Sequence, residues 1–354
     1  MNIFINLFIF YSKQLLKSFL YLGSMLFMLI MLISRFVINN KQPYDYMDYG
    51  SFVGEMMLII QAIMLLFMVF FYKLFSDEFK FGANNLFVGS FRTTLIKIAA
   101  LFCNHILYMV LFIGVQISLI FIYFYFVGIP FSSFYKQTIA YIIVYWFSPF
   151  LFSFFLGILI ALVFGKKKIS FVFLIVIWLA IGPMNTELFS QYFRKLSFSD
   201  LGSLFYIGPL HSENSFNDLV GYNISLSAYL KISFWCISVI IIILISLLKS
   251  ARSIREKSSL FIICFVLLIG NTMIFPKIFK NDNPIFSYRN SSQETLYYKG
   301  RKDDVDPNYL QYDITQYDIK INVNKTVSAE TKVRISNVKN NKLSFVLYHF
   351  FEVK

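Results

Sequence analysis

The sequence predicts an all-α polytopic membrane protein, N-terminus inside, with a small, incomplete extracytoplasmic β-sheet tail. Three observations predict this fold class. Of the 354 residues, 58% are hydrophobic and only 14% are charged, whereas soluble domains carry about 25% charged residues. The hydrophobic residues gather in seven long runs. After residue 276 the pattern changes to an alternation of polar and apolar residues, which is typical of β-strands.

Each of the seven apolar runs predicts a membrane-spanning helix, because about 20 apolar residues in a helix cross roughly 30 Å of hydrocarbon. The fifth run, "ISFVFLIVIWLAIGPM", is the shortest, and the tail would emerge on the other side if this run did not cross. Residues 1–16 have an apolar face, and Lys13 and Lys17 lie near the end of this stretch. This combination predicts an amphipathic helix lying in the interface. The runs are 17–38, 52–75, 98–126, 138–164, 169–184, 231–249 and 258–276.

The basic residues predict the orientation. Up to residue 276, the side of the membrane that holds the N-terminus carries 13 Lys and Arg residues, and the other side carries 6. The positive-inside rule therefore places the N-terminus in the cytoplasm and the tail outside a cell membrane. The net charge of +13 does not indicate nucleic-acid binding, because these residues flank apolar runs. The expected surroundings are a lipid bilayer.

Three of the polar residues inside the apolar runs are singled out as candidates. Glu55 lies near the outer end of the second run, and Asn104 and His105 lie in the third. Ionisable residues at membrane depth are candidates for function. The alternatives are that Glu55 reaches into the headgroups and that Asn104 and His105 form hydrogen bonds between helices. Ser148-Pro149 predicts a kink in the fourth run.

The connection between the second and third runs reads "KLFSDEFKFGANNLFVGSFRTTLIKI". An acidic pair, a glycine, an apolar stretch and a basic residue follow one another, and this order resembles the cytoplasmic loop of type-2 ABC exporter permeases. The first six runs and the long 185–229 loop are similar to the same family, whereas a seventh run departs from it. The alternative is an ordinary solvated connector. The residues that carry the resemblance are Asp77, Glu78, Gly82, Leu86 and Arg92.

The resemblance implies that residues 1–16 and 76–92 dock onto an ABC ATPase subunit on the cytoplasmic face. The sequence contains no G-x-x-x-x-G-K-[ST] motif. No cofactor is therefore expected in this chain, and ATP would bind to a separate subunit. The family also implies a homodimer or a heterodimer with a similar permease.

The tail predicts three strands. "QYDIKINVN" and "SAETKVRIS" alternate in polarity around a turn at 324–326, and "LSFVLYHFFEV" follows a second turn. This outline resembles the start of the N-terminal β-domain of gluzincin-class zinc aminopeptidases. The alternative is another outer β-hairpin module. The matching residues are Tyr317, Asp318, Ile319, Ile321, Asn337, Leu343, Phe345 and Leu347.

The zinc motif of that class is absent from the sequence. His105, His211 and His349 are far apart, and none is followed by Glu. We therefore expect no metal site and no enzyme activity in this chain, whose tail would be part of a truncated or split peptidase. The predicted organisation is an interfacial helix (1–16), a permease domain (17–276), a linker (277–308) and a β-segment (309–354). The alternative functions are a membrane anchor for such a peptidase and a membrane protein whose hairpin binds an outer partner.

Overall fold

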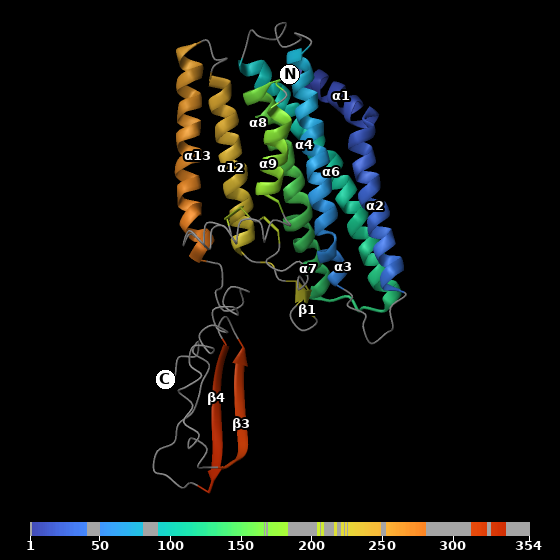
Figure 1. The fold of residues 1–354 in the computed structure, drawn as a ribbon, viewed down its shortest axis with the longest axis vertical. Coiled ribbons are helices and arrows are strands. Elements are labelled where there is room, and N and C mark those ends of the chain that lie inside the picture. Colours follow the sequence, from blue (N-terminus) through green and yellow to red (C-terminus); the bar gives the residue numbers. More distant parts are fainter. Residues whose placement is uncertain are drawn as a thin grey trace. The chain divides into compact units, whose positions relative to one another are not determined.

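The computed structural model divides the chain into two compact units, Met1–Asp282 and Asn283–Lys354. The first is a bundle of long helices, and the second contains a β-hairpin (Figure 1). The structure describes residues 2–40, 50–80, 91–165, 167, 169–182, 204–205, 207–208, 216–217, 221–222, 224, 226–248, 253–280, 313–323 and 327–337.

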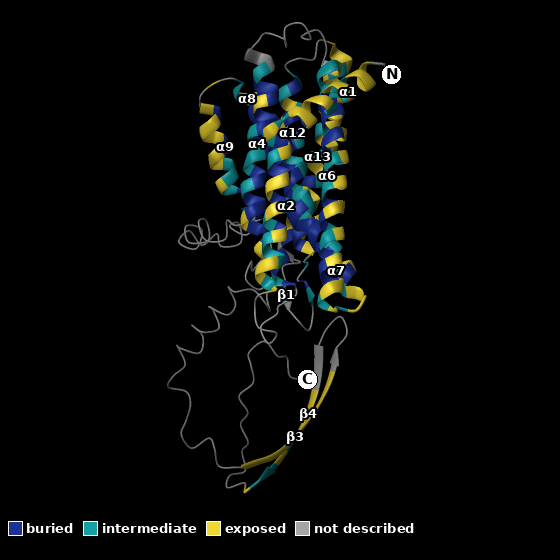
Figure 2. Ribbon diagram, turned by 90° about the vertical axis from the view of Figure 1, so that its right-hand side faces the viewer, coloured by how far each residue is buried: buried dark blue, intermediate teal, exposed yellow. Residues whose placement is uncertain are grey.

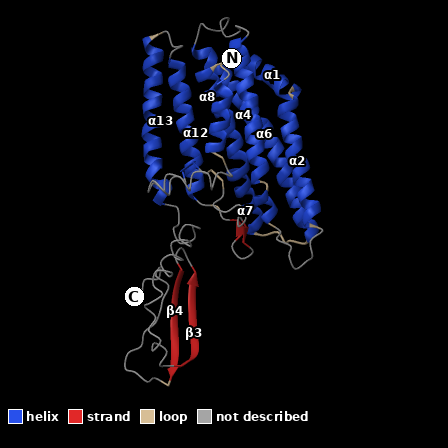
Figure 3. Ribbon diagram, viewed as in Figure 1, coloured by secondary structure: helices blue, strands red, loops and turns tan. Residues whose placement is uncertain are grey.

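Among the described residues, six helical segments are long and apolar enough to cross a membrane, and they contain all or most of every predicted run except the fifth. They indicate a membrane protein. The helices of the bundle are α1 (Asn2–Lys17), α2 (Phe19–Asn39), α3 (Ser51–Glu55), α4 (Met57–Lys80), α6 (Phe91–Val127), α7 (Ser133–Ile142), α8 (Ser148–Phe164), α9 (Ile169–Ala180), α12 (Leu226–Leu248) and α13 (Ile254–Lys280) (Figure 3).

The bundle has two ends, which are named here after the helices found there. At the α1 end lie α1, the last turns of α4, α8 and α12, and the first turns of α6, α9 and α13 (Figure 1). At the α3 end lie α3 and the first turns of α7 and α12 (Figure 1). A two-stranded sheet of β1 (Phe216–Asn217) and β2 (Gly221–Tyr222) is also at the α3 end, where Tyr222 donates a hydrogen bond of 3.1 Å to the carbonyl of Gly50.

The fifth predicted helix is shorter than expected. The α9 helix has 12 residues and is therefore about 18 Å long, less than the roughly 30 Å of a hydrocarbon core. The chain nevertheless passes from the α1 end, where α9 begins, to the α3 end, where α12 begins (Figure 1). The Tyr72 hydroxyl donates to the carbonyl of Gly165 before α9, and the Trp235 indole donates to the carbonyl of Leu204 after it.

Helices α4 and α8 form the centre of the bundle. Their apolar segments are 67% and 61% buried, whereas the segment in α13 is only 17% buried. Figure 2 shows this contrast as dark blue inner helices and yellow outer surfaces. Gly157 of α8 lies directly against α4, since a Cβ atom placed there would be 2.8 Å from the carbonyl oxygen of Met68. A residue without a side chain therefore sets how closely the two helices pack.

A π-helical turn, Ile143–Phe147, joins α7 to α8 at the predicted Ser148-Pro149 irregularity. Pro149 has no N–H group and cannot continue the α-helical hydrogen bonding. The Ser148 N–H and hydroxyl both donate to the carbonyl of Ile143, and the hydroxyl bond is 2.9 Å long. The wider turn thus gives the carbonyl of Ile143 two donors directly before the proline.

The second unit contains strands β3 (Asp313–Val323) and β4 (Val327–Ser336), paired antiparallel. The two predicted strands are therefore confirmed, whereas the turn at 324–326 and the third strand lie outside the described residues. Tyr317 pairs with Val333 and Ile319 with Thr331 on one face, and Asp318 pairs with Lys332 on the other. A bulge between Ile314 and Gln316 keeps Ile314 in register with Ile335. The hairpin therefore has one apolar and one charged face.

Asn337 ends the second strand with a positive φ of 56°. Asparagine tolerates this left-handed conformation better than most residues. Its side-chain amide donates a hydrogen bond of 2.7 Å to the carboxylate of Asp313 at the start of β3. Asn337, which is part of the aminopeptidase-like outline, thus closes the open end of the hairpin.

Candidate functional site

The N-terminal helix α1 is attached to the bundle along one side. Tyr11 and Leu15 are buried, and the Ser12 hydroxyl forms a hydrogen bond of 2.6 Å with the Tyr108 hydroxyl of α6. The Asn104 amide donates to the carbonyl of Phe8 at 2.8 Å. Burial raises the pKa of the Tyr11 hydroxyl, so this group stays neutral. The predicted helix is confirmed, and it is fixed to α6 by side chains.

The other side of α1 carries both apolar and basic residues. Ile5, Ile9 and Leu16 are exposed, and so are Lys13 and Lys17. Ser18 then breaks the helix, because its hydroxyl accepts the N–H of Tyr21 and caps the start of α2. An exposed face of this composition suits the boundary between a bilayer and water.

Three of the five predicted coupling residues fall on helices, Asp77 and Glu78 on α4 and Arg92 on α6. Asp77 is half-buried and belongs to the last turn of α4, which continues to Lys80, and Arg92 is exposed in the first turn of α6. Neither side chain has an ion pair or hydrogen bond with a residue that the structure describes. Glu78 also belongs to α4, but the position of its side chain, together with Gly82 and Leu86, lies outside the described part.

The ends of α4 and α6 that carry Asp77 and Arg92 are joined close to these residues. The ammonium group of Lys97 on α6 lies 5.4 Å from the ring centre of Phe75 on α4, a cation–π contact. Tyr72, one turn before Phe75, holds the carbonyl of Gly165 after α8. The α1 end thus combines a half-exposed carboxylate and an exposed guanidinium with helices that are fixed to one another.

His105 lies in the centre of the bundle, enclosed by aromatic rings. Its Nδ1 is 2.9 Å from the Tyr21 hydroxyl of α2, and its Nε2 is 3.3 Å from the carbonyl of Phe150 on α8. The rings of Phe71 and Phe154 lie 4.8 and 5.6 Å from the imidazole. The structure therefore places His105 in a hydrogen-bonded contact among three helices, the structural alternative considered above for this residue.

Asn104 faces the opposite way from His105, toward α1, and its amide donates to both Phe8 and Ala100. Glu55 lies at the α3 end and forms an ion pair of 2.5 Å with Arg35 of α2. Both groups are partly exposed. The structure does not bring Glu55 together with Asn104 and His105, so these three residues do not form one site.

The sequence did not indicate several polar contacts within the bundle. Gln61 of α4 and Trp178 of α9 exchange hydrogen bonds: the Gln61 amide donates to the Trp178 carbonyl, and the Trp178 indole donates to the Gln61 carbonyl. Gln116 and Trp146 are buried, and their side-chain polar atoms have no partner among the described residues. A glutamine inside an apolar run is the signal that could have singled out these positions.

No cluster of three or more His, Cys, Asp or Glu side chains that could hold a metal occurs in the described ranges. Comparison with known proteins finds no matching protein family, no matching curated protein and no matching solved structure.

Proposed function

We propose that the chain is the membrane subunit of an ATP-driven exporter of the ABC type, and that its α1 end receives a separate ATPase. The observation that carries this proposal is the arrangement of α1, Asp77 and Arg92 at one end of the bundle. Asp77 and Arg92 have no charged partner among the described residues, and α1 presents exposed lysines at the same end of the bundle. Unpaired charges of both signs at one surface suit a soluble protein partner.

The attachment of α1 gives this docking surface a mechanical connection to the membrane helices. A displacement of α1 acts on α6 through Ser12–Tyr108 and Phe8–Asn104, whose distances are 2.6 and 2.8 Å. The next residue, His105, connects α6 to α2 and α8. Rigid helices joined in this way move together, so nucleotide-driven motion of the ATPase would reach the centre of the bundle.

We place the α1 end in the cytoplasm because basic residues gather there, as the positive-inside rule requires. In this arrangement the α9 region is a further crossing, and α13 ends outside. The described basic positions toward the α1 end are Lys13, Lys17, Lys73, Lys80, Arg92, Lys97, Lys167, Arg255 and Lys257, and those toward the α3 end are Arg35, Lys136, Lys231, Lys277 and Lys280.

The outer surfaces of α2, α6 and α13 are largely apolar and exposed in the single chain, with only 28%, 28% and 17% of their apolar segments buried. We assign most of this surface to contact with the lipid bilayer of a cell membrane. A second permease subunit, identical or similar, would cover the remainder. Neither role requires a cofactor in this chain.

The test is copurification of the tagged full chain from its native membrane in mild detergent, followed by mass spectrometry. An ABC ATPase at a stoichiometric level is the expected result. The double charge reversal Asp77→Lys/Glu78→Lys should reduce the amount of ATPase recovered. The matched control is Lys136→Glu, a charge reversal at an exposed position of the α3 end. Equal ATPase recovery with both variants would contradict the docking surface.

A second candidate function is a membrane anchor for an outer β-domain of the zinc-aminopeptidase type. It is favoured by the hairpin, in which Tyr317 and Ile319 are 57% and 59% exposed on an apolar face. A two-stranded hairpin is marginally stable unless other strands or helices cover such a face. Recovery of a zinc peptidase fragment without an ATPase would support this anchor function over the exporter.

A further inference from the structure

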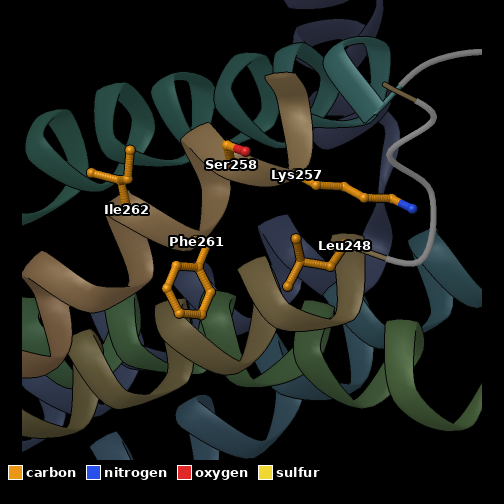
Figure 4. Close-up of a pocket in the computed structure, with 5 residues that line it drawn as sticks. All are labelled: Leu248, Lys257, Ser258, Phe261 and Ile262. Carbon is orange, nitrogen blue, oxygen red and sulfur yellow. The ribbon is translucent and has the colours of Figure 1, made fainter. Parts of the chain in front are cut away.

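A groove lies between the last turn of α12 and the first turns of α13, at the α1 end. It is lined by Leu248, Lys257, Ser258, Phe261 and Ile262 and has a volume of about 600 Å³. Figure 4 shows the Lys257 side chain at one end of the groove, with the Phe261 ring on the same helix farther along it. One part of the groove is therefore basic and the rest is apolar.

The ammonium group of Lys257 has no carboxylate partner among the residues described. The adjacent acid, Glu256, is turned toward the helix N-terminus: its carboxylate accepts the N–H of Ser253, and its own N–H donates to the Ser253 hydroxyl. This reciprocal capping box directs the only acidic residue of 249–257 to the helix start. Four basic residues, Lys249, Arg252, Arg255 and Lys257, occur in the same stretch.

The groove lies where the polar connection meets the apolar helices. Leu248 is the last residue of the apolar segment of α12, and the apolar part of α13 begins after Ser259, at Leu260. Phe261 and Ile262 are 66% and 61% exposed, although they belong to a helix with the length and composition of a membrane span. A ligand that fills this groove must have an anionic group and a long apolar part.

We propose that the groove binds an anionic phospholipid, with its phosphate at Lys257 and Ser258 and an acyl chain along Phe261 and Ile262. Charge complementarity selects the headgroup, since a net positive stretch beside a membrane helix attracts anionic lipids. The apolar wall selects a lipid over a soluble phosphate, because only a lipid covers Phe261 and Ile262. The proposal requires that the bundle lies in a membrane, and it does not depend on the exporter function.

The experiment uses the purified full chain in mild detergent and measures its thermal unfolding as lipid is added. The probes are phosphatidylglycerol, phosphatidylcholine with the same acyl chains, and soluble glycerol phosphate. Phosphatidylglycerol should raise the unfolding temperature in a saturable manner, and the other two should not. Equal stabilisation by phosphatidylcholine, or by glycerol phosphate, would overturn the anionic-lipid assignment.

Three variants locate the site. Lys257→Gln should weaken the apparent affinity for phosphatidylglycerol about fivefold, because one basic residue near an anionic lipid surface contributes about 1 kcal/mol. Lys257→Arg should retain the affinity, and Lys136→Gln, at the α3 end, should leave it unchanged. The unfolding temperature without added lipid serves as the folding control for each variant. If Lys257→Gln and Lys136→Gln both kept the affinity of the unchanged protein for phosphatidylglycerol, the groove would be refuted as the binding site.

Discussion

The hydroxyl of Tyr21 and the Nδ1 atom of His105, 84 positions apart in the sequence, are 2.9 Å apart in the buried centre of the bundle. The other ring nitrogen of His105 faces the carbonyl of Phe150, which can only accept a hydrogen bond. Nε2 therefore carries the proton, and Nδ1 accepts from Tyr21. A neutral imidazole with a defined tautomer connects α6 to α2 and α8.

Tyr21→Phe should destabilise the helical unit without changing the shape of its core. The phenylalanine ring keeps the contacts with Phe67 and Phe70, whereas His105 Nδ1 loses its donor. Hydrogen bonds between membrane helices contribute about 0.6 kcal/mol on average and up to about 1.7 kcal/mol, so the unfolding temperature in detergent should fall by a few degrees. The control is Tyr125→Phe at an exposed position, and an equal effect of both variants would contradict the importance of the bond.

Gly157→Ala should loosen the packing of α8 against α4. The added Cβ would lie 2.8 Å from both the Met68 carbonyl oxygen and the Phe71 Cβ atom, so one helix must move. Overpacking of this kind costs about 1–3 kcal/mol. Gly114→Ala is the matched control, because a Cβ atom at Gly114 meets nothing within 4 Å. Thermal unfolding in detergent measures the difference, and equal stability of the two variants would show that the close approach is not required.

The two residues of the ion pair between Arg35 and Glu55 should be exchangeable, because the swapped pair still joins opposite charges. Glu55→Arg alone brings two cations together and should lower the unfolding temperature at low salt. The swapped double variant Arg35→Glu/Glu55→Arg should recover most of the loss. Both groups are partly solvated, so their coupling should be below about 1 kcal/mol and should decrease as salt is added. A double variant no better than Glu55→Arg would indicate that Glu55 has another role at the α3 end.

The charged face of the hairpin predicts a local rescue experiment. Lys320 lies opposite Glu330, and Asp318 lies opposite Lys332. Lys320→Glu places like charges opposite each other, and such a pair is unfavourable by about 0.2–1 kcal/mol. Amide hydrogen exchange of β3 and β4 in the full chain should accelerate by up to about fivefold in this variant. The exchange should slow again in Lys320→Glu/Glu330→Lys, and no recovery would mean that the pairing does not stabilise the strands.

The sequence pattern was sufficient for the long helices and for the hairpin. Runs of about 20 apolar residues have one stable structure in a bilayer, so α2, α4, α6, α8, α12 and α13 could be located from composition alone. Period-two alternation likewise located β3 and β4. Both patterns are local, and a local pattern suffices to predict a single helix or strand.

Contacts between helices could not be predicted in this way. Nothing in the sequence indicates that Tyr21 meets His105, or that Gln61 meets Trp178, because pairs 84 and 117 positions apart depend on how the helices pack. The acidic pair of the coupling motif was assigned to a loop, although α4 continues through it to Lys80. The apolar run ends before α4 does, because charged residues such as Asp77 and Lys80 are compatible with a helix outside the apolar region. Hydropathy alone therefore placed the end of this helix too early.

In the arrangement proposed above, where the α9 region crosses the membrane, the short α9 helix also affects the lipid around it. A bilayer adapts to a span that is too short by local thinning, and this hydrophobic mismatch is concentrated at the helix end. At that end the Gln61 amide binds the Trp178 carbonyl, one of the four terminal carbonyls that a helix leaves without a partner. A Cβ atom at Gly182 would overlap the side-chain nitrogen of Gln61, so a larger residue there would displace the Gln61 amide. The protein itself thus solvates a peptide group that would otherwise face acyl chains, and the membrane beside α9 is expected to be thinner than elsewhere around the bundle.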